Sequence, residues 1–199
     1  MTGYSVEILK DLRAKTNASL ADCKKVLEET HGDVEKSEKL LKTRGLAVAE
    51  KKSGRTAREG DIASYIHSNG KIGVLVELYC ETDFVARAPE FKQLAHDLAL
   101  HIAASAPKYV SRQDIPNEIL EEEKRIISQD FAKSGKPQQI IDKIVSGKLA
   151  ALEAEITLLG QPFVKDPDRT VQQVITEAIA KFGEKITVGR FTRLTLGQS

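Results

Sequence analysis

The feature that most constrains the fold is a pair of β-strand patterns joined by a tight-turn sequence. Residues 61–67 predict one strand, and Ser68-Asn69-Gly70 then supplies the Asn-Gly step that short hairpin turns prefer. In the second strand, residues 71–79, the side chains of one face are all apolar: Ile72, Val74, Val76 and Leu78. Because successive side chains point to opposite faces of a strand, this hairpin has an apolar face that must be covered.

Two further segments complete a small α+β core. Residues 186–196 form a β-branched, Thr-rich run that predicts a third strand of a small antiparallel sheet. Between Pro89 and Ala106 apolar side chains recur at helical spacing, and Pro107 ends the pattern. Since three strands with one apolar face are stable when a helix packs on them, we expect this helix to cover the sheet. A last helix is expected at 169–182.

Short amphipathic helices are predicted in residues 4–52, before this core. Ser19 has the position and chemistry of a cap for the second helix, and Asp33 of a cap for the third. Gly45 is expected to interrupt the third helix. Cys23 has the helical spacing of a core residue, and we interpret it as a small hydrophobic side chain. Together these helices predict a mini-domain whose small core needs support.

The expected domain boundary lies in a basic segment with little apolar content, residues 50–60, which is typical of a solvated connector. It separates a helical domain, 1–52, from a core and dimerisation domain, 53–199. Within the second domain, residues 116–160 predict a helical hairpin that turns at Ser134-Gly135-Lys136-Pro137. Such an arm can project and bind another helix, or pack onto the chain's own core, and the pattern favours neither.

The point where the second strand ends, Thr82-Asp83-Phe84-Val85, is the main candidate for function. It puts a large aromatic side chain beside a carboxylate where the chain leaves a sheet. A rigid strand would support Phe84 as a wedge for insertion into another protein. The alternative, which the pattern by itself favours, is that Phe84 covers the local core while Asp83 caps the next turn.

Charge and motifs limit the class of function. The 30 Lys and Arg side chains nearly balance the 29 Asp and Glu, which argues against a dedicated nucleic-acid surface. The sequence has no phosphate-binding loop, no dinucleotide fingerprint and no His or Cys pair at metal-ligand spacing, so we expect neither cofactor nor metal. A binding or regulatory protein is favoured over an enzyme.

Membrane and export signals are missing from the sequence as given. The chain has no apolar run long enough to span a bilayer, and its N-terminus lacks the apolar core of a signal peptide. We therefore expect a cytoplasmic protein that makes no contact with a membrane.

Segments along nearly the whole chain resemble, in order, the bacterial elongation factor Ts family. The N-terminal matches are Leu12-Arg13-Ala14-Lys15-Thr16, Asp22-Cys23-Lys24-Lys25 and Gly32-Asp33. The run from Cys80 to Arg87, Cys-Glu-Thr-Asp-Phe-Val-Ala-Arg, resembles the family's signature. Further matches are His101-Ile102-Ala103-Ala104-Ser105, Ser134-Gly135-Lys136-Pro137 and Gly160-Gln161-Pro162-Phe163-Val164. The length resembles the short form of the family.

The resemblance implies guanine-nucleotide exchange on elongation factor Tu, a GTPase of translation elongation. It implies a ubiquitin-associated-like N-terminal domain in which Arg13 and Leu20 contact the partner. It also implies that the Thr82–Val85 segment binds the partner, with Asp83 and Phe84 entering near its magnesium site. His101 matches a histidine that contributes to the same insertion, and short members of the family are expected to be homodimers.

Other classes of function stay open at this point. One is a helical-arm scaffold that joins proteins without affecting nucleotide binding. Another is an enzyme with a site assembled from Asp83, His96 or His101. A third is a nucleic-acid module, although the near-neutral charge counts against direct binding of nucleic acid.

Overall fold

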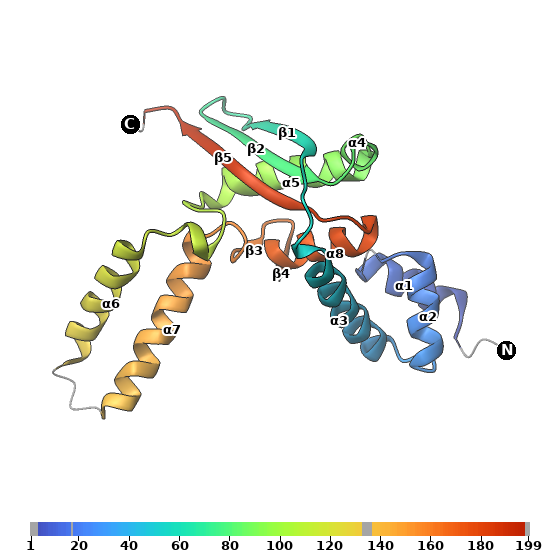
Figure 1. The fold of residues 1–199 in the computed structure, drawn as a ribbon, viewed down its shortest axis with the longest axis horizontal. Helices are drawn as coiled ribbons and strands as arrows, with labels where there is room; N and C mark the ends of the chain where they lie inside the picture. Colours follow the sequence, from blue (N-terminus) through green and yellow to red (C-terminus); the bar gives the residue numbers. More distant parts are fainter. Residues whose placement is uncertain (1–3, 17, 133–136, 198–199) are drawn as a thin grey trace. The chain divides into compact units, whose positions relative to one another are not determined.

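The structure is a computed structural model that describes residues 4–16, 18–132 and 137–197 of the 199-residue chain, apart from the side chain of Ala132. The chain divides into two compact units, which we call the tip unit and the arm unit. The tip unit contains Met1–Ile62, Glu77–Ala95 and Gln173–Val188, and the arm unit contains Ala63–Val76, His96–Gln172 and Gly189–Ser199. Helices and strands occur together, as the predicted α+β class requires (Figure 1).

Three helices, α1 (Val6–Thr16), α2 (Leu20–Glu29) and α3 (Val34–Ser53), pack on one another at the start of the tip unit. Val34, Leu40 and Leu41 of α3 pack against the buried side chains of α1 and α2, which are Leu9, Leu12, Cys23, Val26 and Leu27. The helix starts follow the predicted caps, since Ser19 Oγ accepts a hydrogen bond from the backbone N–H of Asp22 and Asp33 accepts one from Lys36. Burial of Cys23 in this core confirms its interpretation as a small hydrophobic residue.

Helix α3 runs through Gly45, so the predicted interruption is wrong. The glycine is buried, and a methyl group added there would meet the side chains of Ala180 and Thr176 at 3.8 and 3.9 Å. Both belong to α8 (Val171–Phe182), which therefore packs directly against this part of α3. Packing of this kind offsets the ~1 kcal/mol that an interior glycine costs a helix.

The three-stranded antiparallel sheet has the order β1-β2-β5, formed by Glu59–Ile66, Ile72–Cys80 and Thr187–Thr195. The predicted hairpin turn is confirmed: Gly70 has φ 67°, and its N–H donates to the carbonyl of His67 at 2.8 Å. Farther along the hairpin, a Cβ at Gly60 would lie 2.1 Å from the carbonyl oxygen of Leu78. The strands can approach this closely only because residue 60 has no side chain.

Helix α5 (Pro89–Ser105) carries an apolar face whose residues are buried: Phe91, Ala95, Leu98, Ala99, Ile102 and Ala103. In the tip unit its first half meets α8, where the rings of Phe91 and Phe182 pack edge to face at 6.3 Å. In the arm unit its second half lies against the sheet, because the Arg193 guanidinium of β5 donates to the carbonyl of Ala103. The predicted covering helix is thus present.

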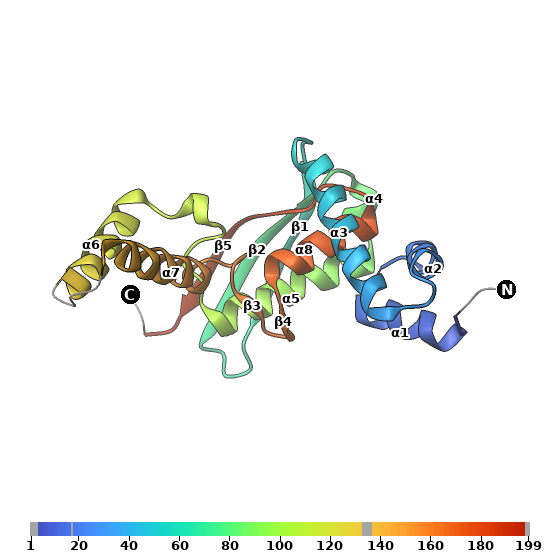
Figure 2. The same cartoon turned by 90° about the horizontal axis from the view of Figure 1, so that it is seen from below.

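The predicted helical hairpin consists of α6 (Asn117–Ala132) and α7 (Gln138–Ile156), which lie side by side in the arm unit (Figures 1 and 2). Its small core is formed by Ile127, Ile141 and Val145. Of the predicted turn, residues 134–136 lie outside the described residues. A 3-10 helix, η1 (Arg112–Asp114), precedes α6.

Two short elements differ from the prediction. The segment Asp166–Thr170, whose end was expected to begin the last helix, is strand β4 and pairs with β3 (Pro162–Phe163). Helix α8 starts only at Val171. Directly after β2, Asp83–Ala86 forms a single helical turn, α4.

Candidate partner-binding site

Phe84 stands on the α4 turn with 83% of its surface exposed, the highest value among the exposed large apolar side chains described. The alternative in which this ring covers the local core is therefore wrong. Ala86, in the same turn, is the residue that faces inward. An exposed phenylalanine on a short turn at the end of a strand offers a large apolar surface for contact with another protein.

Thr82, and not Asp83, caps this turn. Its hydroxyl accepts a hydrogen bond from the backbone N–H of Val85 at 3.4 Å, while its backbone stays extended at φ −126° and ψ 154°. The cap leaves the Asp83 carboxylate free to project, and it forms an ion pair with Arg87 at 3.1 Å. Because both side chains are largely exposed, this pair contributes little to stability and can open when Asp83 meets another charge.

The base of the turn is held by Glu184, from the segment between α8 and β5. Its Oε2 accepts hydrogen bonds from the backbone N–H groups of Glu81 and Thr82, both at 3.1 Å, and its Oε1 accepts one from the Thr82 hydroxyl at 2.6 Å. Sequence reasoning missed Glu184, because the residue lies 102 positions from Thr82 and no local pattern marks it. All these residues belong to the tip unit.

Cys80 supports the same turn from inside the protein. Its thiol is buried and donates to the carbonyl of Thr82 at 3.2 Å. Burial, together with the nearby Glu184 carboxylate, raises the pKa of Cys80 to about 11. The side chain therefore stays a protonated thiol at neutral pH and is a poor nucleophile.

The two predicted contact residues of the N-terminal helices are at the surface. Arg13 lies exposed in the last turn of α1, and Leu20 begins α2 with 46% of its surface exposed. Directly before Leu20, Ser19 binds the Asp22 carboxylate as well as its backbone N–H, which fixes the start of the helix. An apolar side chain at a rigid helix start is suited to protein contact.

His101 differs from the other predicted site residues because it is fully buried, in the arm unit. The backbone N–H of Val164 donates to its Nδ1 at 3.1 Å, so the ring proton lies on Nε2 and is donated to the Gln161 side chain at 2.9 Å. Desolvation lowers the pKa of His101, although the bond to Gln161 opposes this shift. Direct contact of His101 with a partner stays a prediction, and in this conformation the ring has no exposed surface to make it.

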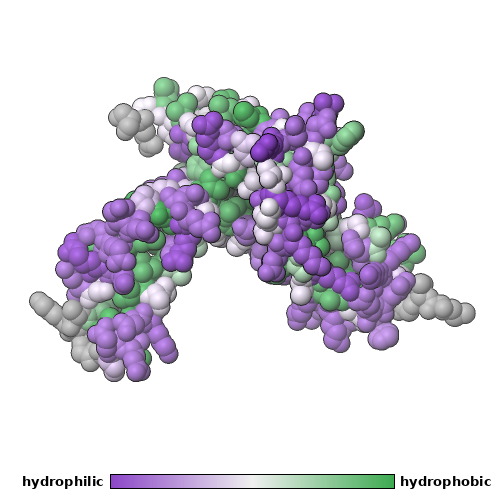
Figure 3. All heavy atoms as spheres, in the orientation of Figure 1, coloured by the Kyte–Doolittle hydropathy of each residue, from purple (hydrophilic) through white to green (hydrophobic). Residues whose placement is uncertain are grey.

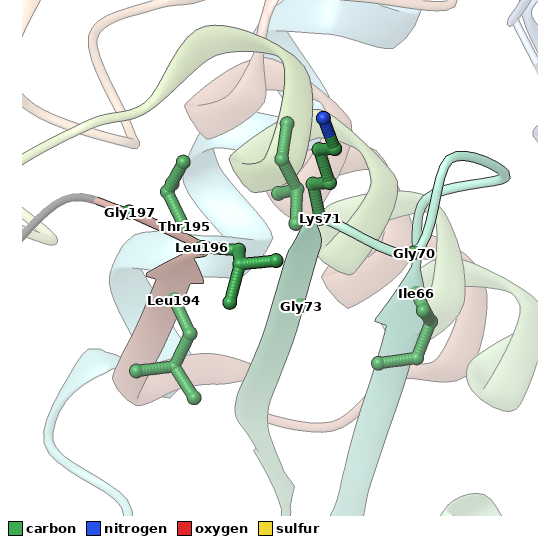
Figure 4. A pocket seen from close by; sticks show the side chains of 9 residues that line it. Ile66, Gly70, Lys71, Gly73, Leu194, Thr195, Leu196 and Gly197 are labelled. Carbon is green, nitrogen blue, oxygen red and sulfur yellow. The ribbon is translucent and has the colours of Figure 1, made fainter.

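Four exposed apolar side chains lie on the outer face of the sheet in the arm unit. Ile66, Leu75, Leu194 and Leu196 are 68%, 53%, 69% and 75% exposed. Hydrophobic surface gathers at the hairpin end of the sheet in Figure 3. Figure 4 shows an open depression there, in which Gly73 separates the side chains of Leu194 and Ile66. A Cβ at Gly73 would lie 3.2 Å from the Ile66 side chain, so the missing side chain deepens the depression.

The described part of the chain holds neither a metal cluster nor a membrane-spanning helix. Within residues 4–16, 18–132 and 137–197, no three His, Cys, Asp or Glu side chains lie together in a way that could hold a metal ion. None of the helices in these ranges is both long enough and apolar enough to cross a bilayer. Among the described residues, the exposed Phe84 turn is the feature that most favours a binding function.

Comparison with known proteins gives a consistent result. A sequence profile of the family described as Elongation factor TS matches residues 5–198. Similar proteins include Elongation factor Ts of Coprothermobacter proteolyticus, which is 52% identical over 98% of both chains. Elongation factor Ts of Thermodesulfovibrio yellowstonii is 51% identical over 98% of this chain and 97% of its own. Elongation factor Ts of Carboxydothermus hydrogenoformans is 49% identical over 96% of this chain and 88% of its own.

Proposed function

The chain belongs to the elongation factor Ts family, and on this premise we propose that it is a guanine-nucleotide exchange factor for elongation factor Tu. It acts in the cytoplasm during translation elongation, where it binds the GTPase and speeds release of GDP. It is a regulator of another protein's nucleotide site and catalyses no bond-making step of its own. The observation that carries the proposal is the exposure of Phe84 on a turn held rigidly by the tip unit.

Insertion of this turn explains how GDP is released. Phe84 gains apolar contacts only when the partner's site is open, and Asp83 comes to lie near the groups that position Mg²⁺. Loss of the metal removes charge neutralisation from the phosphates, so GDP leaves faster. Binding of GDP in turn weakens the hold of the exchange factor by the same factor, because linked binding equilibria are reciprocal.

A single side chain does not suffice for a large acceleration. An increase of about 10⁴-fold requires about 5.5 kcal/mol of differential stabilisation. Burial of one phenylalanine contributes only ~1.5–3 kcal/mol. The remaining stabilisation comes from other contacts with the GTPase in which its nucleotide site is open. We assign these to the N-terminal helices, as a ubiquitin-associated-like domain that docks through Arg13 and Leu20, and to the helical arm of α6 and α7.

His101 has a supporting part in this proposal. Its ring joins α5 to the Gln161–Val164 segment through hydrogen bonds on both nitrogens. Gln161 extends the network, since its amide donates to the carbonyls of Ser105 and Glu155. The histidine thereby keeps the end of α7 in a fixed relation to α5, and any direct contribution to the insertion would require this network to open.

We further propose that the protein is a homodimer that pairs through the apolar outer face of its sheet. Exposed apolar patches of this kind are uncommon on monomers. A two-fold axis through such a face would bring Leu194 and Leu196 of each copy against the same patch of the other. A dimer of this kind carries two tips and can engage two copies of the GTPase.

Release of labelled GDP after rapid mixing tests the exchange function. Elongation factor Tu loaded with fluorescent GDP is mixed with excess unlabelled GDP, with and without this protein, and the release rate is followed. The alternative function, a scaffold that binds through the arm, is favoured by the exposed Ile119, Ile126 and Ile140 on α6 and α7. A scaffold binds the GTPase and leaves the release rate unchanged, and that result would overturn the exchange proposal.

A further inference from the structure

We propose that Glu184 is a positioning residue for nucleotide exchange, because its carboxylate fixes the turn that carries Phe84. The inference rests on the exchange function proposed above, and it assigns a role in that function to a residue outside the Thr82–Val85 segment. Glu184 is to act through Thr82, without contact with the partner.

The geometry shows why the turn needs an external support. Strand β2 ends at Cys80, so the N–H groups of Glu81 and Thr82 lie beyond the part of the chain that pairs in the sheet. The Glu184 carboxylate accepts from both, at 3.1 Å each, and from the Thr82 hydroxyl at 2.6 Å. The bond from the Thr82 hydroxyl has the short length typical of a hydroxyl that donates to a carboxylate. One side chain thus fixes two successive backbone groups and the capping hydroxyl of α4.

The same two segments are joined in the opposite direction as well. The Glu81 carboxylate accepts from the backbone N–H of Lys185 at 2.6 Å and pairs with Arg55 at 3.1 Å. These contacts, the backbone hydrogen bond first, lower the pKa of Glu81. Residues 81–82 and 184–185 therefore exchange carboxylate-to-backbone bonds reciprocally, and we call this arrangement the carboxylate clamp.

The clamp also reaches the end of the N-terminal helices. The ammonium group of Lys185 donates to the carbonyls of Ser53 and Arg55, at 2.7 and 2.8 Å. Ser53 is the last residue of α3, and Arg55 follows in the connector. The Phe84 turn and the C-terminal end of α3 are thus attached to the same short segment, Glu184–Lys185.

This support matters because Phe84 contributes little to holding the turn in place. A residue that is 83% exposed has little contact with the core to fix its direction, so the backbone of Thr82 and Asp83 determines where the ring points. A preorganised group binds without the loss of conformational freedom that a mobile one suffers. Removal of the Glu184 carboxylate should therefore lower the maximal exchange rate and leave folding and docking intact.

The proposed experiment has two readouts. The chain contains no tryptophan, so Phe84→Trp supplies a single fluorescent reporter on the turn. In that background we compare Glu184→Ala, the conservative Glu184→Gln and the control Glu90→Ala, which removes an exposed carboxylate of the tip unit that pairs with Lys181. Time-resolved anisotropy reports motion of the ring in the isolated protein. Stopped-flow GDP release with the tryptophan-free Glu184 variants then gives maximal rate and half-saturation.

For Glu184→Ala we expect a larger fast component in the anisotropy decay and a fall of about tenfold in maximal rate, because the three hydrogen bonds that hold the turn are lost together. The concentration of exchange factor that gives half of the maximal rate should stay within about twofold of the parent value. Glu184→Gln keeps acceptor oxygen and should recover part of both readouts. Unchanged anisotropy in Glu184→Ala overturns the positioning role whether or not exchange occurs. If Glu184→Ala increases the motion of the ring but the parent protein does not stimulate GDP release, the exchange function is refuted. The role of Glu184 in holding the turn is then still supported.

Discussion

Replacement of Phe84 by alanine is the most informative single change in this protein. The ring is 83% exposed, and the turn is held by Thr82 and Glu184 rather than by the ring. Truncation therefore opens no cavity, and we expect the free energy of unfolding to change by less than ~0.5 kcal/mol, as for other surface substitutions. Chemical denaturation of the isolated variant checks this part of the prediction.

The effect on exchange should be far larger. If almost the whole ring is buried in the open complex, its removal costs ~1.5–3 kcal/mol of differential stabilisation. Since each 1.4 kcal/mol changes a rate tenfold, stimulated GDP release should slow by about 10- to 150-fold. The assay is stopped-flow release of fluorescent GDP from elongation factor Tu at saturating exchange factor, so that the rate reports the open complex and not the affinity.

Two further variants control this measurement. Phe84→Leu keeps part of the apolar surface and should give an intermediate rate. Val164→Ala removes an exposed apolar side chain between β3 and β4, outside the N-terminal helices and outside α6 and α7, and should leave the rate unchanged. Parent-like release by Phe84→Ala, or an equal loss in Val164→Ala, would refute the insertion argument.

Three other predictions concern docking, assembly and pH. Arg13→Ala and Leu20→Ala should each weaken complex formation by about fivefold to tenfold in calorimetry, because each removes one contact of an exposed docking surface. Leu194→Asp should convert the proposed homodimer into monomers in sedimentation equilibrium, because it places a charge in the apolar face of the sheet. Burial lowers the pKa of His101, so the unfolded chain binds a proton at this residue more readily than the folded chain does. The contribution of the neutral ring to the free energy of unfolding is therefore fully present above about pH 6.5, and it is lost as the pH falls below that value. The midpoint of thermal unfolding should drop between about pH 7.5 and pH 5.5, and less so in His101→Gln.

Each of these predictions has a clear counter-result. Unchanged affinity in both Arg13→Ala and Leu20→Ala removes the docking role of the first two helices. A parent protein that sediments as a monomer ends the dimer proposal, and a Leu194→Asp dimer moves the interface elsewhere. An identical pH dependence in parent and His101→Gln shows that this buried ring does not govern the acid loss of stability.

The sheet and the helical hairpin could be predicted from sequence because their signals are local. Asn69-Gly70 determines the hairpin turn, and regular alternation marks β2. The near-heptad repeat marks α7 in the same way. Strand β4 was missed because Asp166–Thr170 is short and polar and contains Pro167, so it shows no alternation.

Gly45 and Glu184 show what a local pattern does not contain. Gly45 was expected to break a helix, and the helix continues at a point where α8 packs against α3. For Phe84, the sequence allowed both a buried cap and an exposed wedge, and the exposure of the ring in the folded chain decides between them. The clamp by Glu184 could not be foreseen, because its two halves meet only in the tertiary fold.

His101 combines a family match with a position that the sequence pattern does not determine. The resemblance places it with the inserting residues, and in the folded chain it is a buried, neutral ring with hydrogen bonds on both nitrogens. A histidine at helical spacing in an apolar segment is compatible with a buried and with an exposed position, and the contacts with Gln161 and Val164 show the buried one. Its contact with a partner stays a prediction.

The central claim is that the Phe84 turn opens the magnesium and phosphate pocket of elongation factor Tu. The most direct test compares GDP release stimulated by the parent protein and by Phe84→Ala, first with Mg²⁺ present and then after the metal has been chelated. The claim predicts that Phe84→Ala stimulates GDP release much more slowly than the parent protein when Mg²⁺ is present. The difference in rate should shrink after chelation, because no metal is then left for the turn to displace. A deficit of equal size under both conditions would show that the turn does not act through the metal pocket.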